Sequence, residues 1–230
     1  MNWALSTHSH SANCSRARPV FRRYNSGNLL INNLALSLFH LKKAMELIEY
    51  INTKIKLTAA ESDAIDSAFK RELHPKGTTL VHPDNQSQKG YFVEKGLIRS
   101  FYNKDGKDIT HFFFDEDSFT MPLESIYFNS PDPYGKEVLE NTTLRTIHFR
   151  EFNVLYKEID AFKDLAFKVA VEVLKQFSDR LFSLQFQTAE QRYKYMINNY
   201  SNILLRVPLG HIASYLGITQ QTLSVIRAKN

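Results

Sequence analysis

The fold is decided by the stretch Val207-Pro-Leu-Gly-His-Ile-Ala-Ser-Tyr-Leu-Gly-Ile-Thr-Gln-Gln-Thr-Leu-Ser-Val-Ile-Arg-Ala-Lys229, whose spacing predicts a helix-turn-helix. The positions that build this motif are Ala213, Gly217, Leu223 and Ile226. The alanine provides the small side chain that a steep crossing of two helices requires, and the glycine allows the positive φ of the turn. The leucine and the isoleucine lie three residues apart, so both face back to the core. Thr219 has the hydroxyl group that caps the second helix.

The other side chains of the predicted second helix point away from the core. They include amides and a guanidinium, which are the groups that read base edges in the major groove. We therefore interpret the stretch as a DNA-binding helix-turn-helix, and a purely structural helical hairpin is the alternative. The expected DNA contacts are Thr219, Gln220, Gln221, Ser224, Arg227, Lys229 and His211. For the histidine, simple solvent exposure is an equally good interpretation.

The charge of the chain is unevenly distributed along its 230 residues. The net charge is +6 over residues 1–44, −5 over 45–187 and +4 over 188–230. A basic C-terminal part that follows an acidic middle fits contact with a polyanion at the C-terminal end. The overall net charge of +5 is by itself a weaker indication.

Cysteine usage and hydropathy limit the compartment and the cofactors. Cys14 is the only cysteine, so one chain forms no internal disulfide and no thiolate-ligated zinc or iron–sulfur site. This composition suits the cytoplasm. No apolar run approaches the roughly 20 residues that a membrane span needs, so no membrane contact is expected.

Residues 1–44 have little periodicity, and we expect a disordered extension there. Arginines that precede the apolar run Leu29–Phe39 loosely resemble a signal peptide, but the run is interrupted by Asn32 and Asn33. An upstream start codon is a further alternative, because a well-patterned domain begins at Met45.

The pattern over residues 45–159 predicts a domain that begins with helices and continues with short strands. Met45–Arg71 is expected to be helical, with a capping box at Thr58 and Glu61. Period-two patterns then predict strands, which we list as Thr78–Val81, Gly90–Glu94, Leu97–Asn103, Asp108–Phe114, Val138–Asn141 and Leu144–Phe149. The last two are expected to pair with each other. Short antiparallel strands between Gly, Pro and Asp turns indicate a β-roll of the jelly-roll type.

A long helix is predicted over residues 160–187, after a short one at Glu151–Ile159. Its apolar residues recur every three or four positions: Phe162, Leu165, Val169, Val173, Phe177, Leu181 and Leu184. A stripe of this length favours a dimerisation helix, and packing on the chain's own roll is the alternative. Residues 188–230 complete the chain as the helix-turn-helix domain.

This order of elements resembles the CRP/FNR superfamily of bacterial transcription regulators over residues 45–229. Two places carry the resemblance: the segment Gly90–Lys107, which is similar to the family's strand pair, and the helix-turn-helix. The resemblance implies an α+β fold with a cyclic nucleotide-binding-like β-roll, a long dimerisation helix and a C-terminal winged helix-turn-helix. It also implies a homodimer that binds double-stranded DNA at a palindromic promoter site, with RNA polymerase as a further partner.

The loop that holds cyclic AMP in some members departs from the family pattern. Those members use a Gly-Glu pair and a later arginine, whereas residues 119–136 contain neither, and no arginine occurs between Asp115 and Leu144. Phe119, Glu124 and Lys136 are the candidate ligand-pocket residues that remain. We therefore expect no cofactor and no cyclic AMP bound in the usual way.

The predicted second helix also departs from the best-known relative. Gln220 and Gln221 stand where the cyclic-AMP receptor has arginine and glutamate, and Val225 replaces its second arginine. Glutamine pairs with adenine, whereas arginine prefers guanine. The target sequence is therefore expected to differ, towards A·T-rich steps.

The main alternative is a small β-barrel enzyme of the cupin type, or a ligand-binding module that does not bind DNA. A cupin metal site needs two histidines close together on one strand, a glutamate and a later histidine. The candidates occur singly, at His74, His82, His111 and His148. No nucleophile motif or phosphate-binding loop is present, so we expect neither catalysis nor a metal.

Overall fold

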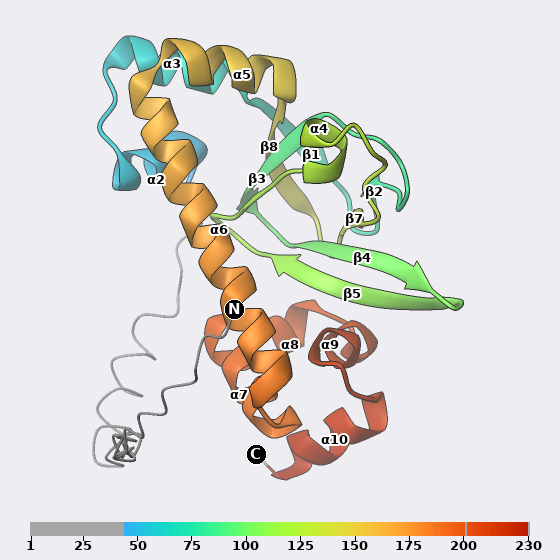
Figure 1. Ribbon diagram of the computed structural model, residues 1–230. Coiled ribbons are helices and arrows are strands. Elements are labelled where there is room, and N and C mark those ends of the chain that lie inside the picture. Colours follow the sequence, from blue (N-terminus) through green and yellow to red (C-terminus); the bar gives the residue numbers. More distant parts are fainter. Residues whose placement is uncertain (1–43, 201, 230) are drawn as a thin grey trace, which may run out of the picture. The chain divides into compact units, whose positions relative to one another are not determined.

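The computed structural model describes residues 44–200 and 202–229. The expected disordered extension therefore lies outside the described residues, except for Ala44, and so does Cys14. None of the described helices combines the length and the apolar character needed to cross a membrane. Figure 1 shows the order of the helices and strands along the chain.

Two four-stranded antiparallel sheets form the β-roll (Figure 1). The first sheet has the order β1 (Lys70–His74), β8 (Thr142–His148), β3 (Lys89–Lys95) and β6 (Phe119–Thr120). The second has the order β2 (Thr79–Val81), β7 (Gly135–Val138), β4 (Ile98–Lys104) and β5 (Lys107–Phe114). Apolar side chains from both sheets, such as Val93, Ile98 and Leu144, meet in one buried cluster. The predicted antiparallel roll is confirmed.

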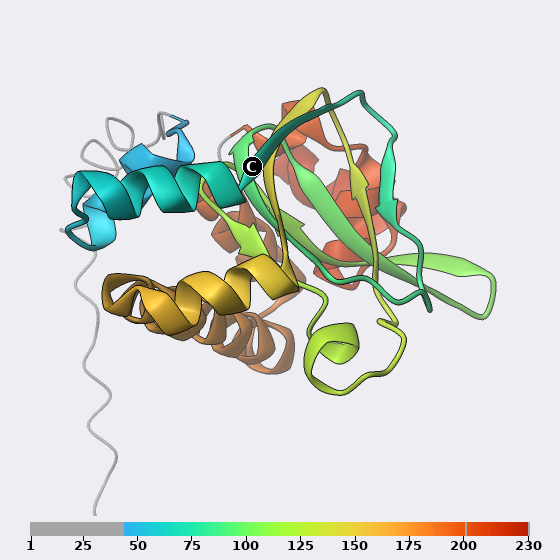
Figure 2. The ribbon, with the colours of Figure 1, turned by 90° about the horizontal axis from the view of Figure 1, so that it is seen from above.

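The β4–β5 hairpin follows from its turn residues. Asp105 and Gly106 have φ values of 53° and 73°, which are the two positive values that a two-residue hairpin turn needs. The hairpin projects from the roll in Figure 2. A bulge lies between Ser100 and Phe101, so the pairing of β4 with β5 shifts by one residue there.

The predicted pairing of the last two strands was wrong. Strand β7 pairs with β2 and β4, whereas β8 pairs with β1 and β3. The short connection at residues 139–141 carries the chain from one sheet to the other, so neighbours in sequence are not neighbours in a sheet. Strands β1 and β6 and the short helix α4 (Leu123–Tyr127) were not predicted.

Three helices and the start of a fourth cover the outer face of the first sheet. They are α2 (Leu47–Lys54), α3 (Ala59–Ala68), α5 (Phe149–Glu158) and α6 (Asp160–Phe186). Figure 2 shows α3 and α5 side by side over this face. Phe92 and Ile147 of the sheet join Phe162 and Leu165 of α6 in their buried cluster. Thr58 and Glu61 form the predicted capping box at the start of α3.

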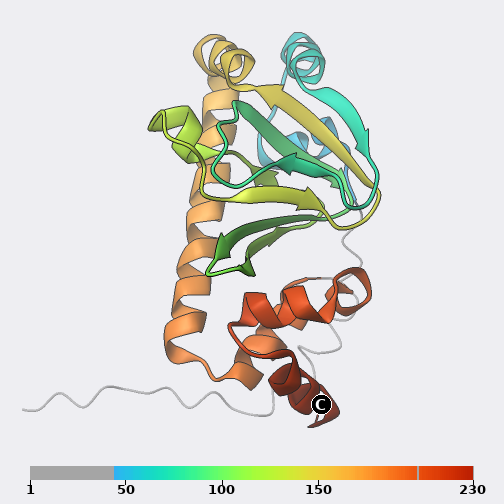
Figure 3. The ribbon, with the colours of Figure 1, turned by 90° about the vertical axis from the view of Figure 1, so that its right-hand side faces the viewer.

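The C-terminal part consists of α7 (Ala189–Asn199), α8 (Ile203–Arg206), α9 (Leu209–Leu216) and α10 (Gln220–Lys229). Figure 3 shows α6 running past the roll to these helices. Their buried cluster also contains Leu97, Phe113 and Leu139 of the roll, so the two parts share one apolar core. The described residues of 188–229 include no strand, so the wing of the expected winged helix-turn-helix is not among them.

Candidate nucleic-acid interface

Helices α9 and α10 are joined by a tight turn at Gly217. Gly217 has a φ of 66°, and its N–H donates to the carbonyl groups of Ala213 and Ser214. Ala213 is buried where the two helices meet, and a side chain larger than alanine would push them apart. Thr219 Oγ1 accepts a hydrogen bond of 3.1 Å from the backbone N–H of Thr222, so the threonine caps α10.

Helix α10 presents one buried face and one exposed face. Leu223 and Ile226 are buried against the rest of the C-terminal helices. The expected DNA contacts on this helix, Gln220, Gln221, Ser224, Arg227 and Lys229, are all exposed. The exposed part of α10, which also includes Val225 and Ala228, is called the α10 face.

His211 lies apart from the α10 face, at the start of α9. It is half-buried, and its Nδ1 lies 2.9 Å from Nη1 of Arg99 on β4. Burial, and then the charge of Arg99, lower the pKa of His211, so the neutral ring accepts a hydrogen bond from the guanidinium. Its Nδ1 is therefore already engaged by Arg99.

Arg99 is a buried cation at the contact between the roll and α9. Its side chain is 2% exposed, and it donates from Nε to Glu137 at 2.7 Å and from Nη2 to Asp108 at 2.7 Å. Close by, the backbone N–H of Thr110 donates to Ser214 Oγ at 2.9 Å. Three elements, β5, β7 and α9, thus contribute partners to one guanidinium.

Arg206 makes an ionic contact between the two parts. From α8, its Nη2 donates to Glu116 at 2.8 Å, to Glu140 at 2.6 Å and to the carbonyl oxygen of Gly96 at 2.9 Å. Burial alone would raise the pKa of Glu116, but the hydrogen bonds from Arg206 and from the backbone lower it. Gly96 has a φ of 109°, and a Cβ there would lie 2.3 Å from Thr142 Oγ1, so the carbonyl position depends on glycine.

Neither arginine was a sequence candidate. Arg99 directly follows Leu97 and Ile98 in a predicted strand, where a charge is unusual, and this was the only local signal. Its partner His211 is 112 positions further along the chain, which a reading of local patterns does not connect. A third arginine, Arg192 of α7, donates to the carbonyl groups of Leu216 and Gln187.

The expected dimer seam on α6 needs correction. Phe162 and Leu165 are buried in the chain's own core, and Val169 packs partly against that core. Phe177 packs against Phe112 of the roll in a tilted arrangement, with ring centroids 5.1 Å apart. Val173 is half-buried, and Leu184 points along the same side of the helix, next to Gly217. Phe162, Leu165, Val169 and Val173 face the chain itself, and Phe177 and Leu184 contact it while remaining 37% and 43% exposed. Of the predicted seam, only Leu181 lies on the opposite side.

That opposite side of α6 is exposed and carries four large apolar residues. Its positions repeat with steps of four and three residues: Phe167, Val171, Leu174, Ser178, Leu181 and Gln185. We call these residues the α6 stripe. Leu174 is 69% exposed and Phe167 is 70% exposed, which is unusual for large apolar residues that recur along one helix face. The steps are those of a heptad repeat.

The sequence matches no protein-family model, and no curated protein matches it significantly. Solved structures do resemble it. FixK2 from Bradyrhizobium japonicum is 16% identical, with a TM-score of 0.61, over 70% of this chain and 83% of that one. CLP from Xanthomonas campestris, a c-di-GMP-responsive global regulator, is 13% identical, with a TM-score of 0.60, over 75% and 91%.

A third similar structure is a transcriptional regulator of the CRP/FNR family from Eubacterium rectale. It is 15% identical, with a TM-score of 0.57, over 74% of this chain and 82% of that one. The described part of this chain has the CRP/FNR fold. At these identities the likeness establishes the fold and not the activity.

Within the CRP/FNR fold, the three candidate ligand-pocket residues do not share a site. Phe119 packs among the rings of Tyr50, Phe69 and Phe92, on the side of the roll that the helices cover. Glu124 is exposed on α4. Lys136 is buried and forms an ion pair of 3.3 Å with Asp132. The expected pocket is therefore corrected, because the three side chains have different neighbours.

Aromatic side chains fill the space between β5, the loop before β7 and α6. His111 stacks on Tyr134 and on Phe177, with centroid distances of 4.1 and 5.9 Å. Burial, and then the charges of Arg180 and Lys136, lower the pKa of His111 to about 4. The neutral ring thus connects the roll to α6, and Arg180 connects α6 to α9 by lying 3.7 Å from the ring centre of Tyr215.

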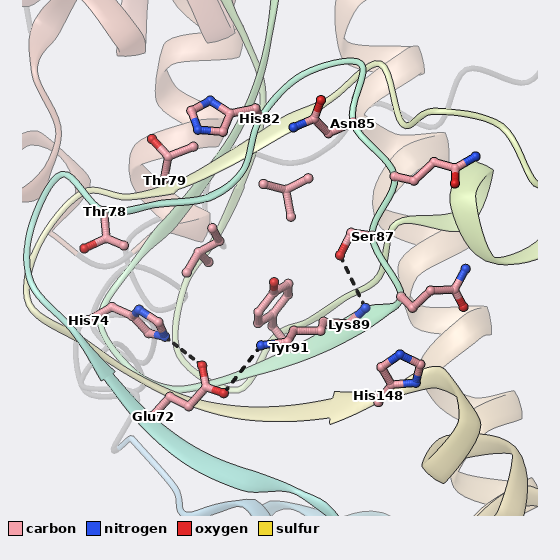
Figure 4. A pocket seen from close by; sticks show the side chains of 14 residues that line it. Glu72, His74, Thr78, Thr79, His82, Asn85, Ser87, Lys89, Tyr91 and His148 are labelled. Carbon is pink, nitrogen blue, oxygen red and sulfur yellow. Dashed lines mark hydrogen bonds and ion pairs between the residues drawn. The ribbon is translucent and has the colours of Figure 1, made fainter.

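A cavity of about 480 Å³ lies elsewhere in the CRP/FNR fold, between β1, β2, β3 and the end of β8 (Figure 4). Three of the four histidines that occur singly in the sequence, His74, His82 and His148, line it together. Glu72 already pairs with His74 at 3.1 Å and with Lys89 at 3.9 Å. Among the described residues, no three side chains of His, Cys, Asp or Glu are grouped so as to hold a metal.

Replacing Arg206 with methionine is expected to lower the free energy of unfolding by about 2–3 kcal/mol, because Glu116 and Glu140 would lose their shared cation. Lys194→Met removes an exposed ion pair with Glu190 and is expected to cost less than about 0.5 kcal/mol. Denaturant titration of both variants measures the difference. Equal losses for the two variants would contradict a structural role for the Arg206 contact.

The stability of the protein is expected to fall with acidification because of His111. Its pKa is about 4 in the folded chain and 6.5 ordinarily, so between these values the unfolded state binds more protons. The free energy of unfolding therefore falls as the pH decreases from 6.5 to 4, by at most about 1.4 kcal/mol per pH unit from this residue. In His111→Phe, which keeps the ring stack, denaturant titrations are expected to show a shallower pH dependence. An unchanged dependence would refute the assignment.

Proposed function

We propose that the chain is a transcription regulator that binds double-stranded DNA as a homodimer at a palindromic promoter site. The observation that carries this proposal is the α10 face, which exposes amides and cations on the second helix of a tight helix-turn-helix. Helices in this position enter the major groove in proteins of this motif. The E. rectale neighbour is described as a transcriptional regulator, which supports the same class of function.

Charge supports DNA as the partner. Residues 188–230 carry a net charge of +4, while the preceding 45–187 carry −5. Arg227 and Lys229 are exposed at the end of α10, where long cationic side chains reach phosphates. The acidic roll would be repelled by DNA, so the chain approaches DNA with its C-terminal helices.

The α6 stripe supports a second copy of the chain as the other partner. A parallel pair of α6 helices would bury the stripe of one copy against the same stripe of the other. Both helix-turn-helix units would then lie at the same end of the pair. Two half-sites about 34 Å apart, one helical turn of DNA, would match such a pair.

We assign residues 45–159 as the effector-type domain, 160–187 as the dimerisation helix and 188–230 as the DNA-binding domain. The roll would act as a scaffold or as a degenerate sensor that does not bind cyclic AMP in the usual way, because residues 119–136 lack the Gly-Glu pair and the arginine that hold the cyclic phosphate. Such a regulator would act in the cytoplasm, with RNA polymerase as its further partner and without catalytic activity of its own.

The purified chain is expected to shift a fluorescent random-sequence duplex of about 30 base pairs in a gel at low salt. If Arg227 and Lys229 of both copies contact phosphates, log affinity should fall with log salt with a slope of about −3.6. Leu174→Glu places one negative charge from each copy between the two α6 stripes, which opposes dimerisation. It is expected to weaken DNA binding at least about tenfold, because the two helix-turn-helix units then bind independently.

The matched control is Leu73→Glu, since Leu73 is a large exposed apolar residue on β1, outside the α6 stripe. It is expected to leave the affinity within about twofold. No shift by the unaltered chain even at low salt would contradict DNA binding. A shift that Leu174→Glu leaves unchanged would contradict the dimer seam.

A further inference from the structure

The centre of the α10 face can be located from the helix geometry. Successive residues of an α-helix are rotated by roughly 100°. The direction opposite to the buried pair Leu223 and Ile226 is therefore occupied by Gln221, Ser224, Val225 and Ala228, all of which are exposed. These residues form the centre of the surface that would face the base edges. None of them is charged.

Hydroxyl groups around this centre already have partners within the helix. Ser224 Oγ donates to the carbonyl oxygen of Gln220 at 3.0 Å. Thr219 Oγ1 and Thr222 Oγ1 lie 2.9 Å apart, and the first also accepts the capping hydrogen bond. Gln220 extends back over α9, since a Cβ added to Gly210 would lie 2.9 Å from its Nε2. The amide of Gln221 thus remains as the polar group that projects outward from the centre.

Val225 is the apolar group beside that amide. It lies four residues after Gln221, so the two share one side of the helix, about 6 Å apart along its axis. Its side chain is 51% exposed, although α10 has two buried positions for apolar residues. A distance of about 6 Å corresponds to roughly two base-pair steps.

Cations stand on the two sides of the centre. Arg227 is rotated to one side of the outward direction and Lys229 to the other, by the same 100° rule. Both are placed for the phosphates on opposite walls of a groove. The centre itself therefore has no arginine that could pair with guanine.

We propose that α10 recognises A·T base pairs, with Gln221 paired to the N6 and N7 positions of an adenine and Val225 packed on the C5-methyl group of a thymine. This proposal rests on the DNA-binding function proposed above. Amide–adenine pairing is bidentate, and an aliphatic side chain in contact with the thymine methyl group is the other A·T-specific contact of the major groove.

The thymine methyl group allows a direct test, because uracil pairs identically but lacks that group. Duplexes bound by the purified chain are selected from a random library through several cycles. The enriched pool is then copied with thymine or with uracil, and the affinity of the chain for each copy is measured by gel shift. The loss of one buried methyl group per half-site is expected to weaken binding of the uracil pool by about tenfold for the dimer.

Two variants separate the contacts. Val225→Ala is expected to bind the thymine and uracil pools equally, both at about the affinity of the unaltered chain for uracil. Gln221→Arg is expected to select guanine at one position of each half-site in place of adenine. Both residues are exposed, so neither change is expected to disturb folding, which thermal unfolding checks.

The outcomes distinguish DNA binding from the two proposed base contacts. Failure of the library to enrich would overturn DNA recognition and this inference together. Enrichment without a uracil effect, or an equal uracil effect in Val225→Ala, would overturn the valine contact while DNA binding stands. A selected motif that Gln221→Arg leaves unchanged would overturn the glutamine contact.

Discussion

One side of α6 has no covering element among the described residues, and the proposed pairing of two copies depends on that side. A helix of 27 residues that were buried only on its own roll would need one apolar side. Here Phe162 and Leu165 fill that side, while the α6 stripe repeats on the opposite side with heptad steps. Exposure of apolar side chains such as Leu174 to water is unfavourable, so the stripe favours association with an identical helix.

The same helix connects the roll to the helix-turn-helix. Phe177 stacks against His111 of the roll, and Arg180 lies on Tyr215 of α9. Two arginines join the two parts directly: Arg99 of the roll contacts His211 of α9, and Arg206 of α8 pairs with Glu116 and Glu140. Because these contacts and the shared apolar core fix α9 relative to α6, a pair of α6 helices would also fix the distance between two α10 helices. A ligand or partner that altered these contacts would alter that distance.

Local patterns in the sequence were sufficient for the capping box at Thr58 and the turn at Gly217, since each depends on residues close together in the chain. Contacts between distant residues were not predictable in this way. The pairing of β7 and β8 with different sheets and the partners of Arg99 are of this kind. The register of the α6 seam failed for another reason: α6 carries apolar residues on both sides, so a three-to-four-residue spacing fits either stripe. The residues of the α10 face remain predictions as DNA contacts.

A disulfide test addresses the pairing of two α6 helices most directly. Cys14 is the only cysteine, so Cys14→Ser with Leu174→Cys leaves a single thiol on the α6 stripe. In a parallel pair, residue 174 of one copy would face residue 174 of the other within the Cα distance of about 5.5–6 Å that a disulfide needs. The account predicts that mild oxidation converts the protein to a covalent dimer that still binds DNA. A protein that stays monomeric on a non-reducing gel, or a covalent dimer that no longer binds DNA, would contradict it.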